Sequence, residues 1–207
     1  MAQSNNQWIK WVAEIQAIAQ SGRAYTQSPF DVERFNHLLN IASNMASALT
    51  PIAKKEFHEA FTLQKGYATP KVDIRSFVLK NDQVLLVRER ADQLWTIPGG
   101  FADVNETPSE AVIRETKEES GFDVKPLRLL TVWDILKHDH PQQWPHLYKM
   151  IFHCELLAGH PQQNIEISEI DFFPINHLPP LSTPRITQKQ LECLYHLSKQ
   201  SGPTIFD

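Results

Sequence analysis

The stretch from Gly100 to Phe122 reads GFADVNETPSEAVIRETKEESGF, and the rest of the chain is interpreted outward from it. Thr107 suits the residue that caps the start of a helix, Pro108 suits the first helical position, and Glu110 can complete a capping box. Gly121 readily adopts the left-handed conformation that ends many helices. The stretch therefore predicts a helix that begins after Thr107 and ends before Gly121.

Three carboxylates share one face of this predicted helix. At about 100° per residue, Glu115, Glu118 and Glu119 fall within about 100° of one another. Like charges at this spacing repel by roughly 0.2–0.5 kcal/mol per pair, whereas a hard cation that prefers oxygen ligands makes the same arrangement favourable. A charge run on a helix is more often a solvated face, so the three glutamates alone do not distinguish a metal site from a surface.

The spacing of the whole stretch favours the metal site. Its pattern is G-x5-E-x7-R-E-U-x-E-E-x-G-U, where U is usually aliphatic, and its fixed positions are Gly100, Glu106, Arg114, Glu115, Glu118, Glu119 and Gly121. Together with the preceding LWTIPGGF at 94–101, the segment resembles the signature of the Nudix hydrolases. Thr116 departs from the pattern at the first U position, but a small β-branched side chain should still pack inward.

The resemblance implies a metal-dependent hydrolase that acts on a diphosphate. Mg²⁺, with Mn²⁺ as a substitute, is the implied cofactor, and its implied ligands are Glu115, Glu118, Glu119 and Gly99. The ion would lower the pKa of bound water and stabilise the charge that develops on phosphorus. Gly99 and Gly100 would let the backbone approach the metal or the substrate phosphate closely.

Further catalytic roles are assigned to residues inside and beyond this stretch. Arg114 would hold one of the glutamates in place, with direct contact to phosphate as the alternative, and Glu106 would orient Arg114 or the metal shell. A general base is not readable from the stretch. Glu169, with Glu166 beside it, lies on a later strand or loop where Nudix proteins often place an extra metal-binding or basic carboxylate. The alternative for both is an exposed charge at a sheet edge.

The segment HDHPQQWPH at 138–146 is rich in histidine. No carboxylate triad accompanies the histidines, so a loop that faces the substrate is favoured over a zinc site. His140, Trp144 and Tyr148 are the candidate substrate-binding residues here. The two aromatic rings could stack a base or enclose a choline ammonium by cation–π contact, and core packing is the alternative.

Helical periodicity dominates the chain before Val72. It predicts a helix over about residues 6–21 that ends at Gly22, a second that opens at Ser28-Pro29, and a short third that restarts at Thr50-Pro51. Helices this short bury too little to be stable alone, so they must pack on the rest of the chain or on a second copy. Residues 1–66 are therefore expected to form a small all-α domain.

Strand signals take over in residues 67–207, which are expected to form the second domain. Strands are predicted at 72–79, 84–90, 127–137, 147–157 and 166–173, with a hairpin turn at 80–82 and a last helix from Thr183-Pro184. Mixed strands with one helix in the middle and one at the end predict the α/β class. The Nudix resemblance implies the same architecture, an α/β/α sandwich around a mixed sheet.

A second resemblance covers nearly the full length. The segments that carry it are WIKWVAEIQAIAQSGRAY, SPFDVERF, HPQQWPHLYK and SEIDFFPINHLPPLSTPRIT. They look like the Nudix subgroup with an N-terminal helical domain, described as ADP-ribose or CDP-choline pyrophosphatases and typically dimeric. This implies a homodimer that splits a nucleoside diphosphate linked to a small moiety X into nucleoside monophosphate and phospho-X. The alternatives are a Nudix hydrolase acting on RNA ends or caps, and a non-catalytic nucleotide-binding regulator.

Composition narrows the remaining classes. The 207 residues are 42% hydrophobic with a net charge of −4, so a real core is expected and bulk attraction to nucleic acid is not. No apolar run approaches a membrane span, and the polar start MAQSNNQ lacks the blocks of a signal peptide, so a cytoplasmic protein without a membrane partner is expected. Cys154 and Cys193 have no metal-like or redox spacing and are expected to be buried, reduced thiols.

Overall fold

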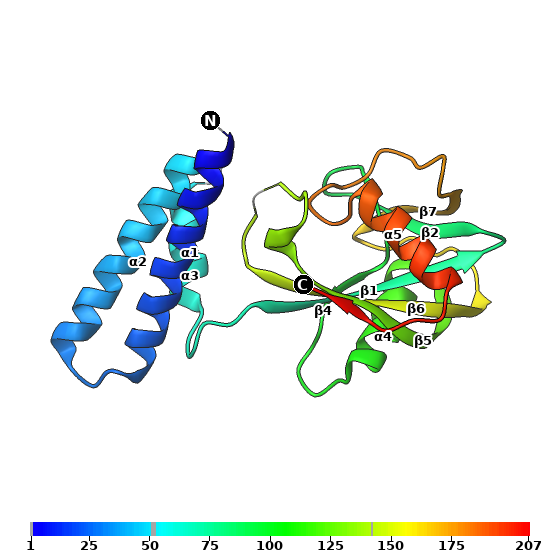
Figure 1. Cartoon of the computed structure of the whole chain (residues 1–207). Helices are drawn as coiled ribbons and strands as arrows, with labels where there is room; N and C mark the ends of the chain where they lie inside the picture. Colours follow the sequence, from blue (N-terminus) through cyan, green and yellow to red (C-terminus); the bar gives the residue numbers. More distant parts are fainter. Residues whose placement is uncertain (1, 51–52, 142) are drawn as a thin grey trace. The chain divides into compact units, whose positions relative to one another are not determined.

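The computed structural model describes residues 2–50, 53–141 and 143–207. Its internal contacts divide the chain into two compact units, Met1–Pro70 and Lys71–Asp207, the first built of helices and the second of strands and helices (Figure 1). The sequence placed the division after residue 66, within the segment that joins the last of these helices to the first strand. In the described part of the chain, every helix is too short or too polar to cross a membrane.

The first unit contains α1 (Ala2–Tyr25), α2 (Pro29–Leu49) and α3 (Lys54–Leu63). The predicted start of α2 is confirmed, because the Ser28 side chain accepts a hydrogen bond from the Asp31 N–H and Pro29 occupies the first turn. The predicted end of α1 at Gly22 is wrong. A Cβ on Gly22 would lie 2.3 Å from the Phe35 ring, so this glycine allows close packing of α1 on α2 and the helix continues to Tyr25.

The second unit is built on a mixed sheet. Its strands are β1 (Lys71–Lys80), β2 (Gln83–Glu89), β3 (Trp95–Thr96), β4 (Gly99–Phe101), β5 (Phe122–Asp134), β6 (Leu147–Gly159), β7 (Ile167–Pro174) and β8 (Ile205–Phe206). The order is β3-β2-β1-β6-β5-β8, with β4 also paired to β1 and β7 to β2. The β1–β6 and β5–β8 pairs are parallel and the others antiparallel. The short strands β3 and β4 form from the LWTIPGGF segment.

Two helices cover different faces of this sheet (Figure 1). Helix α4 (Pro108–Ser120) contributes Ala111 and Val112 to one apolar cluster, which also holds Ile74 of β1. Helix α5 (Gln188–Lys199) contributes Leu191 and Leu194 to a second cluster, which holds Phe77 of β1. Because successive side chains of a strand point to opposite faces, Ile74 and Phe77 separate the two cores. The predicted α/β class, with a helical unit before the mixed sheet, is confirmed.

The last helix begins later than the sequence predicted. Thr187 caps α5 through a capping box with Gln190, so the helix starts at Gln188 and not at Thr183-Pro184. Residues 183–185 instead form a turn, closed by the Arg185 and Ile186 N–H groups donating to the Ser182 carbonyl, and its backbone carbonyls accept bonds from other elements. A proline at the first position suits a helix, but it suits a turn or an extended segment equally well.

Candidate active site

Local sequence places the carboxylate-bearing helix α4 as predicted. The Thr107 side chain accepts a hydrogen bond from the Glu110 N–H, and the Glu110 carboxylate accepts from the Thr107 N–H at 2.8 Å. Gly121 ends the helix in the left-handed conformation with φ of 77°. Because capping residues act within one turn of the helix end, this part of the site follows from neighbouring residues alone.

Two of the three predicted glutamates meet the backbone of β4. The Gly99 N–H donates to Glu119 Oε2 at 2.8 Å, and a Cβ on Gly100 would lie 2.9 Å from Glu115 Oε2. Gly99 itself has φ of 141°, and a Cβ there would lie 2.1 Å from the Ile74 carbonyl oxygen. Close approach of the β1 backbone therefore requires glycine at position 99, and the Glu115 carboxylate packs directly on Gly100. The predicted approach of this backbone to a metal or a phosphate stays a prediction.

The third glutamate, Glu118, is held at the surface by Arg114. Arg114 Nη1 donates to Glu118 Oε2 at 3.0 Å and to Glu115 Oε1 at 2.9 Å. Its Nε and Nη2 donate to the two carboxylate oxygens of Glu106 at 3.0 and 2.7 Å. The Glu106 carboxylate also accepts a hydrogen bond from the Asp103 N–H. The contact with Arg114 lowers the pKa of Glu106 to about 2 and raises that of Arg114. Arg114 thus occupies the predicted role of holding glutamates in place.

Burial shifts the titration of the two inner glutamates. Removal from water raises the pKa of Glu119 to about 7, with Arg75 and the Gly99 N–H opposing and the nearby charges of Glu89 and Glu115 adding to the rise. Burial also raises the pKa of Glu115, against the opposing effect of Arg114. A carboxylate that is hard to ionise without a cation is a recognised feature of functional sites.

Four further charged residues, which sequence reasoning missed, lie deep in the second unit. Together with Glu119, they are the charged residues with the least exposed side chains in the described chain: Asp73, Arg75, Glu89 and Lys149. Arg75 Nε donates to Asp73 Oδ1 at 3.0 Å, and Lys149 Nζ lies 3.5 Å from Asp73 Oδ2. Although burial opposes it, the carboxylates of Asp73, Glu119 and Glu89 raise the pKa of Arg75. The signal that could have found these residues is a charge at an inward position of a predicted strand.

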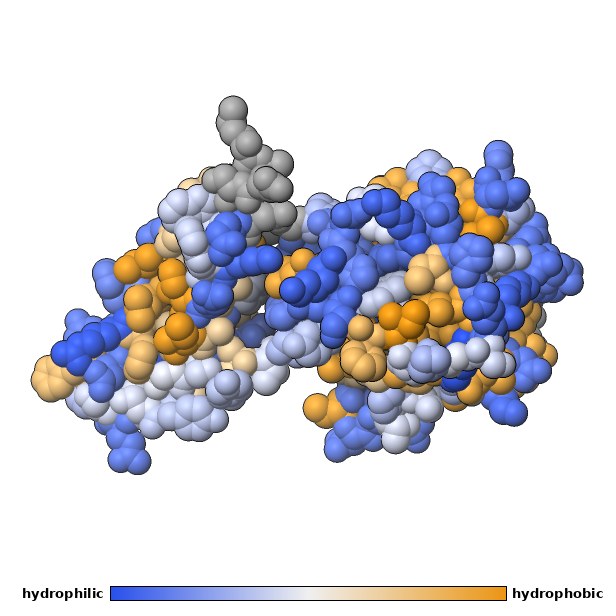
Figure 2. All heavy atoms as spheres, in the orientation of Figure 1, coloured by the Kyte–Doolittle hydropathy of each residue, from blue (hydrophilic) through white to orange (hydrophobic). Residues whose placement is uncertain are grey.

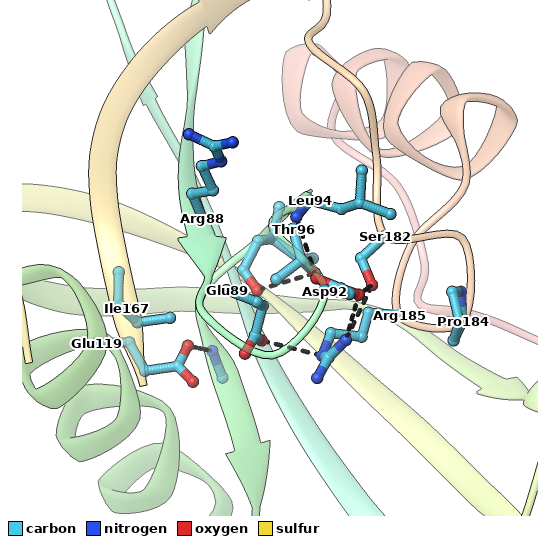
Figure 3. A network of polar contacts seen from close by, with 12 residues as sticks. Arg88, Glu89, Asp92, Leu94, Thr96, Glu119, Ile167, Ser182, Pro184 and Arg185 are labelled. Atoms are coloured by element: carbon cyan, nitrogen blue, oxygen red, sulfur yellow. Dashed lines mark hydrogen bonds and ion pairs between the residues drawn. The ribbon is translucent and has the colours of Figure 1, made fainter. Parts of the chain in front are cut away.

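Glu89 connects this cluster to the segment before α5. Arg185 Nε lies 2.9 Å from Glu89 Oε1, and Arg185 Nη1 donates to Asp92 Oδ2 and to Ser182 Oγ, each at 2.9 Å. The Ser182 hydroxyl donates to Asp92 Oδ2 at 2.7 Å. In Figure 3 the Glu89 carboxylate is drawn between the guanidinium of Arg185 and the carboxylate of Glu119. The end of β2, the turn after it and the segment before α5 are therefore joined beside the buried glutamate.

Glu169, the predicted base, lies apart from this cluster. It forms an ion pair with Arg88, its register partner on β2. Arg88 and Glu89 are consecutive on β2 and point to opposite faces, and Figure 3 shows Arg88 directed away from Glu89. Glu166 is exposed, and its charge acts on Glu89. The base role of either residue stays a prediction.

Two of the predicted substrate-binding residues, His140 and Tyr148, have different surroundings. The His140 ring contacts the Thr183 carbonyl through Nδ1 at 2.7 Å, and among the described residues its buried Nε2 has no hydrogen-bond partner. Burial lowers the pKa of His140 to about 4. Tyr148 precedes Lys149 on β6 and so points to the other face, where its exposed ring meets the edge of His146. Trp144 is half-buried.

The donor atoms at β4 fit a hard divalent cation in kind. Carboxylate oxygens of Glu115 and Glu119 converge on a strand whose backbone lies within their reach, and oxygen donors are what Mg²⁺ prefers. The full set of three is not assembled: in the described ranges, no three His, Cys, Asp or Glu side chains are gathered as metal ligands.

Comparison with known proteins agrees with this geometry. A family model described as "NUDIX domain" matches residues 69–194, and one described as "UDP-X-like, N-terminal oligomerisation domain" matches residues 6–61. A Bacillus subtilis protein, provisionally named ADP-ribose pyrophosphatase YjhB, is 39% identical over 208 residues and covers 100% of both chains.

Two further similarities differ in their reach. The crystal structure titled UDP-X diphosphatase covers 98% of this chain and 99% of its own, with 33% identity and a TM-score of 0.65. The NAD-capped RNA hydrolase NudC of Pseudomonas aeruginosa is 31% identical over 131 residues, 60% of this chain but 43% of that protein. Because the first family model spans more than half of the sequence and full-length relatives accompany it, this chain belongs to the Nudix hydrolase family.

Proposed function

We propose that this chain hydrolyses the diphosphate bond of a nucleoside diphosphate linked to a small moiety X, giving nucleoside monophosphate and phospho-X. The observation that carries the proposal is the convergence of Glu115 and Glu119 on the glycine backbone of β4, beside a buried cluster of paired charges. The full-length relatives are named for ADP-ribose and for UDP-X. CDP-choline, favoured by the sequence resemblance, completes the set of candidate substrates.

Mg²⁺ is the proposed cofactor, with Mn²⁺ as a substitute, since Nudix hydrolases generally use divalent metal ions. Its proposed ligands are Glu115, Glu118, Glu119 and the backbone of Gly99. When bound, the ion draws the anionic diphosphate to this acidic site and offsets charge that develops on phosphorus. Arg114 holds Glu115 and Glu118 in position, and the Gly99 N–H fixes Glu119.

A panel of diphosphate substrates tests the proposed reaction. With Mg²⁺ present, ADP-ribose, CDP-choline or a UDP-linked sugar should be split faster than any nucleoside triphosphate, with products resolved by chromatography. The reason is the full-length similarity, because the Nudix stretch by itself is shared by enzymes of several substrate classes. Faster turnover of dGTP than of all three diphosphate classes would contradict the proposal.

A second candidate is hydrolysis of a nucleotide cap on RNA, which the partial similarity to NudC favours. The net charge of −4 argues for a small substrate, because RNA binding draws on an excess of basic residues at the surface. NAD-capped RNA and free NAD belong in the same panel. Faster cleavage of the capped RNA than of every small diphosphate would favour the RNA-cap hydrolase over the first candidate. Nucleotide binding without any turnover would favour a non-catalytic regulator.

Glu169 and Glu166 are proposed as alternatives for the general base. The ion pair between Glu169 and Arg88 must open for Glu169 to serve, whereas exposed Glu166 lies near enough to act on the charge of Glu89. Replacement of the true base by Gln should lower kcat by about 10²–10⁴-fold with the melting temperature unchanged. Near wild-type rates for both variants would exclude both residues and direct the search to Glu89.

A further inference from the structure

The backbone at Arg185, in the turn before α5, is anchored by hydrogen bonds from other parts of the domain. The backbone carbonyls of Thr183, Pro184 and Arg185 each accept a side-chain bond, from His140 at 2.7 Å, from Gln143 at 2.8 Å and from Lys149 respectively. The bonds come from the 138–146 loop and from β6. The main chain that carries the Arg185 side chain is therefore held by two other parts of the domain.

The guanidinium of Arg185 is held as well, along one of its edges. Its Nε pairs with Glu89 and its Nη1 with Asp92 and Ser182. Among the described residues, no hydrogen bond is made by the Nη2 group, and 29% of the side chain is exposed. Figure 3 shows the guanidinium beside Asp92 and Ser182. A planar guanidinium oriented by two carboxylates thus presents one unoccupied pair of N–H donors to solvent.

The position of this free edge relates it to the proposed metal ligands. Glu89 pairs with Arg185, and Figure 3 shows the Glu89 carboxylate between the Arg185 guanidinium and the Glu119 carboxylate. The free donors thus lie one carboxylate away from the glutamate that is bound to β4. An extended diphosphate held at Glu115 and Glu119 carries negative charge on both phosphates, and a fixed Nη2 edge is suited to oxygens of the outer one.

We propose that Arg185 binds the phosphate of the substrate diphosphate that lies farther from the carboxylates of α4. This inference rests on the proposed function for its substrate class and adds a specific phosphate-binding residue to it. The pairing with Glu89 and Asp92 orients the guanidinium before the substrate arrives, so little side-chain freedom is lost on binding. The alternative is that Arg185 acts only as a structural clasp, which joins the turn after β2 to the segment before α5.

Binding measurements separate these two roles. We would titrate wild type, Arg185→Ala and Arg185→Lys with the α,β-methylene analogues of ADP and UDP in the presence of Mg²⁺, and with adenosine and uridine. Loss of a charge-assisted contact should weaken binding of the diphosphates about 10- to 100-fold in Arg185→Ala, with nucleoside affinity unchanged. Arg185→Lys should fall between, because it keeps the charge and loses the planar fork.

Arg90→Ala is the matched control. Arg90 directly follows β2 and is exposed, and among the described residues its side chain donates one hydrogen bond, to the Asn164 carbonyl. The variant should bind both ligand classes as wild type does. Diphosphate affinity within twofold of wild type in Arg185→Ala would overturn the proposal. Equal weakening of nucleoside and diphosphate would also overturn it and establish the structural clasp.

A measurement on the wild type covers the case in which Arg185→Ala does not fold. Phenylglyoxal modifies accessible guanidinium groups, and the site of modification can be located by mass spectrometry. The methylene diphosphates should protect Arg185, whereas the nucleosides should not. Undiminished modification of Arg185 at saturating diphosphate would overturn the proposal. Hydrolysis of the natural diphosphates, assayed in parallel, tests the proposed function separately, because the methylene analogues report binding without turnover.

Discussion

Glu119 differs from the other two glutamates of α4 in its surroundings. It is 7% exposed and accepts the Gly99 N–H, whereas the Glu118 side chain is 59% exposed and pairs with Arg114. Equal spacing on the helix therefore does not produce equal environments. Without a cation, burial works against the Glu119 charge, and Glu89 and Glu115 add to the effect.

This environment predicts the pH dependence of the metal-free protein. The pKa of Glu119 is raised from 4.5 to about 7, so between these values the folded state binds more protons than the unfolded state. Stability from this group is present below pH 4.5 and is lost as the pH rises through 7. In EDTA, the melting temperature of wild type relative to that of Glu119→Gln should be highest at pH 5 and should fall below it by pH 8.

Activity should respond to the same substitution in the opposite direction. Loss of a charged ligand should forfeit several kcal/mol of transition-state stabilisation, so kcat of Glu119→Gln with Mg²⁺ should fall roughly a thousandfold. The rise in melting temperature that Mg²⁺ gives the wild type should also shrink. Glu155→Gln, at an exposed position of β6, is the control. A marked loss of metal-free stability with normal turnover would mean that Glu119 is structural.

At the scale of elements, the short strand β4 positions the Glu115 and Glu119 carboxylates of α4. It pairs with β1 through Gly99 and Arg75, Gly100 and Ile74, and Phe101 and Asp73. The strand is three residues long, and two of them are glycines that lie against Glu119 and Glu115. A side chain at Gly99 would collide with the backbone of β1, and one at Gly100 would displace the Glu115 carboxylate.

Gly99→Ala should accordingly unfold more easily than wild type. A Cβ with φ of 141° is strained, and it would lie 2.1 Å from the Ile74 carbonyl oxygen, which is backbone and cannot turn aside. We expect a loss of at least about 2 kcal/mol in the free energy of unfolding, measured by urea denaturation followed by circular dichroism. Gly202→Ala, which meets no atom within 4 Å, should change little. Equal free energies of unfolding for the two variants would show that the backbone of β4 accommodates a Cβ at position 99 without loss of stability.

At the scale of the molecule, the helical unit leaves large apolar side chains uncovered. Trp8, Trp11 and Ile18 are 44%, 42% and 64% exposed, and they follow one another along α1 at helical spacing. Val12 of the same helix is only 3% exposed and packs inside the unit. Figure 2 shows apolar side chains gathered on the visible face of this unit. Such a surface on a chain whose N-terminal family model is described as an oligomerisation domain indicates an interface.

A homodimer formed through these helices is the expected assembly. Light scattering on the full chain should give twice the monomer mass of 23.8 kDa at micromolar concentration. The double variant Trp11→Glu with Ile18→Glu should shift the mass to that of a monomer, because charges buried in an apolar interface are costly. The pair Lys10→Glu with Glu14→Lys, on exposed positions of the same helix, is the control. A monomeric wild type would contradict the expectation.

The sequence by itself determined the parts of this protein that depend on near neighbours. The caps of α4, the spacing of its glutamates and the contact of Arg114 with them all follow from interactions within a few residues. The class of the fold followed from the periodicity of its elements. Short-range physics acts on any chain with this order of residues, so these features could be predicted.

Only the tertiary structure decided which distant charges join the site. Asp73 and Lys149 become partners through the parallel pairing of β1 with β6, and Glu89 meets Arg185 through the connection before α5. Glu169 was excluded from the cluster by the alternation of side chains on a ladder whose register shifts at a bulge. Strand order and register arise from packing of the whole domain, and a one-residue change of register moves a side chain to the other face, which no local pattern records.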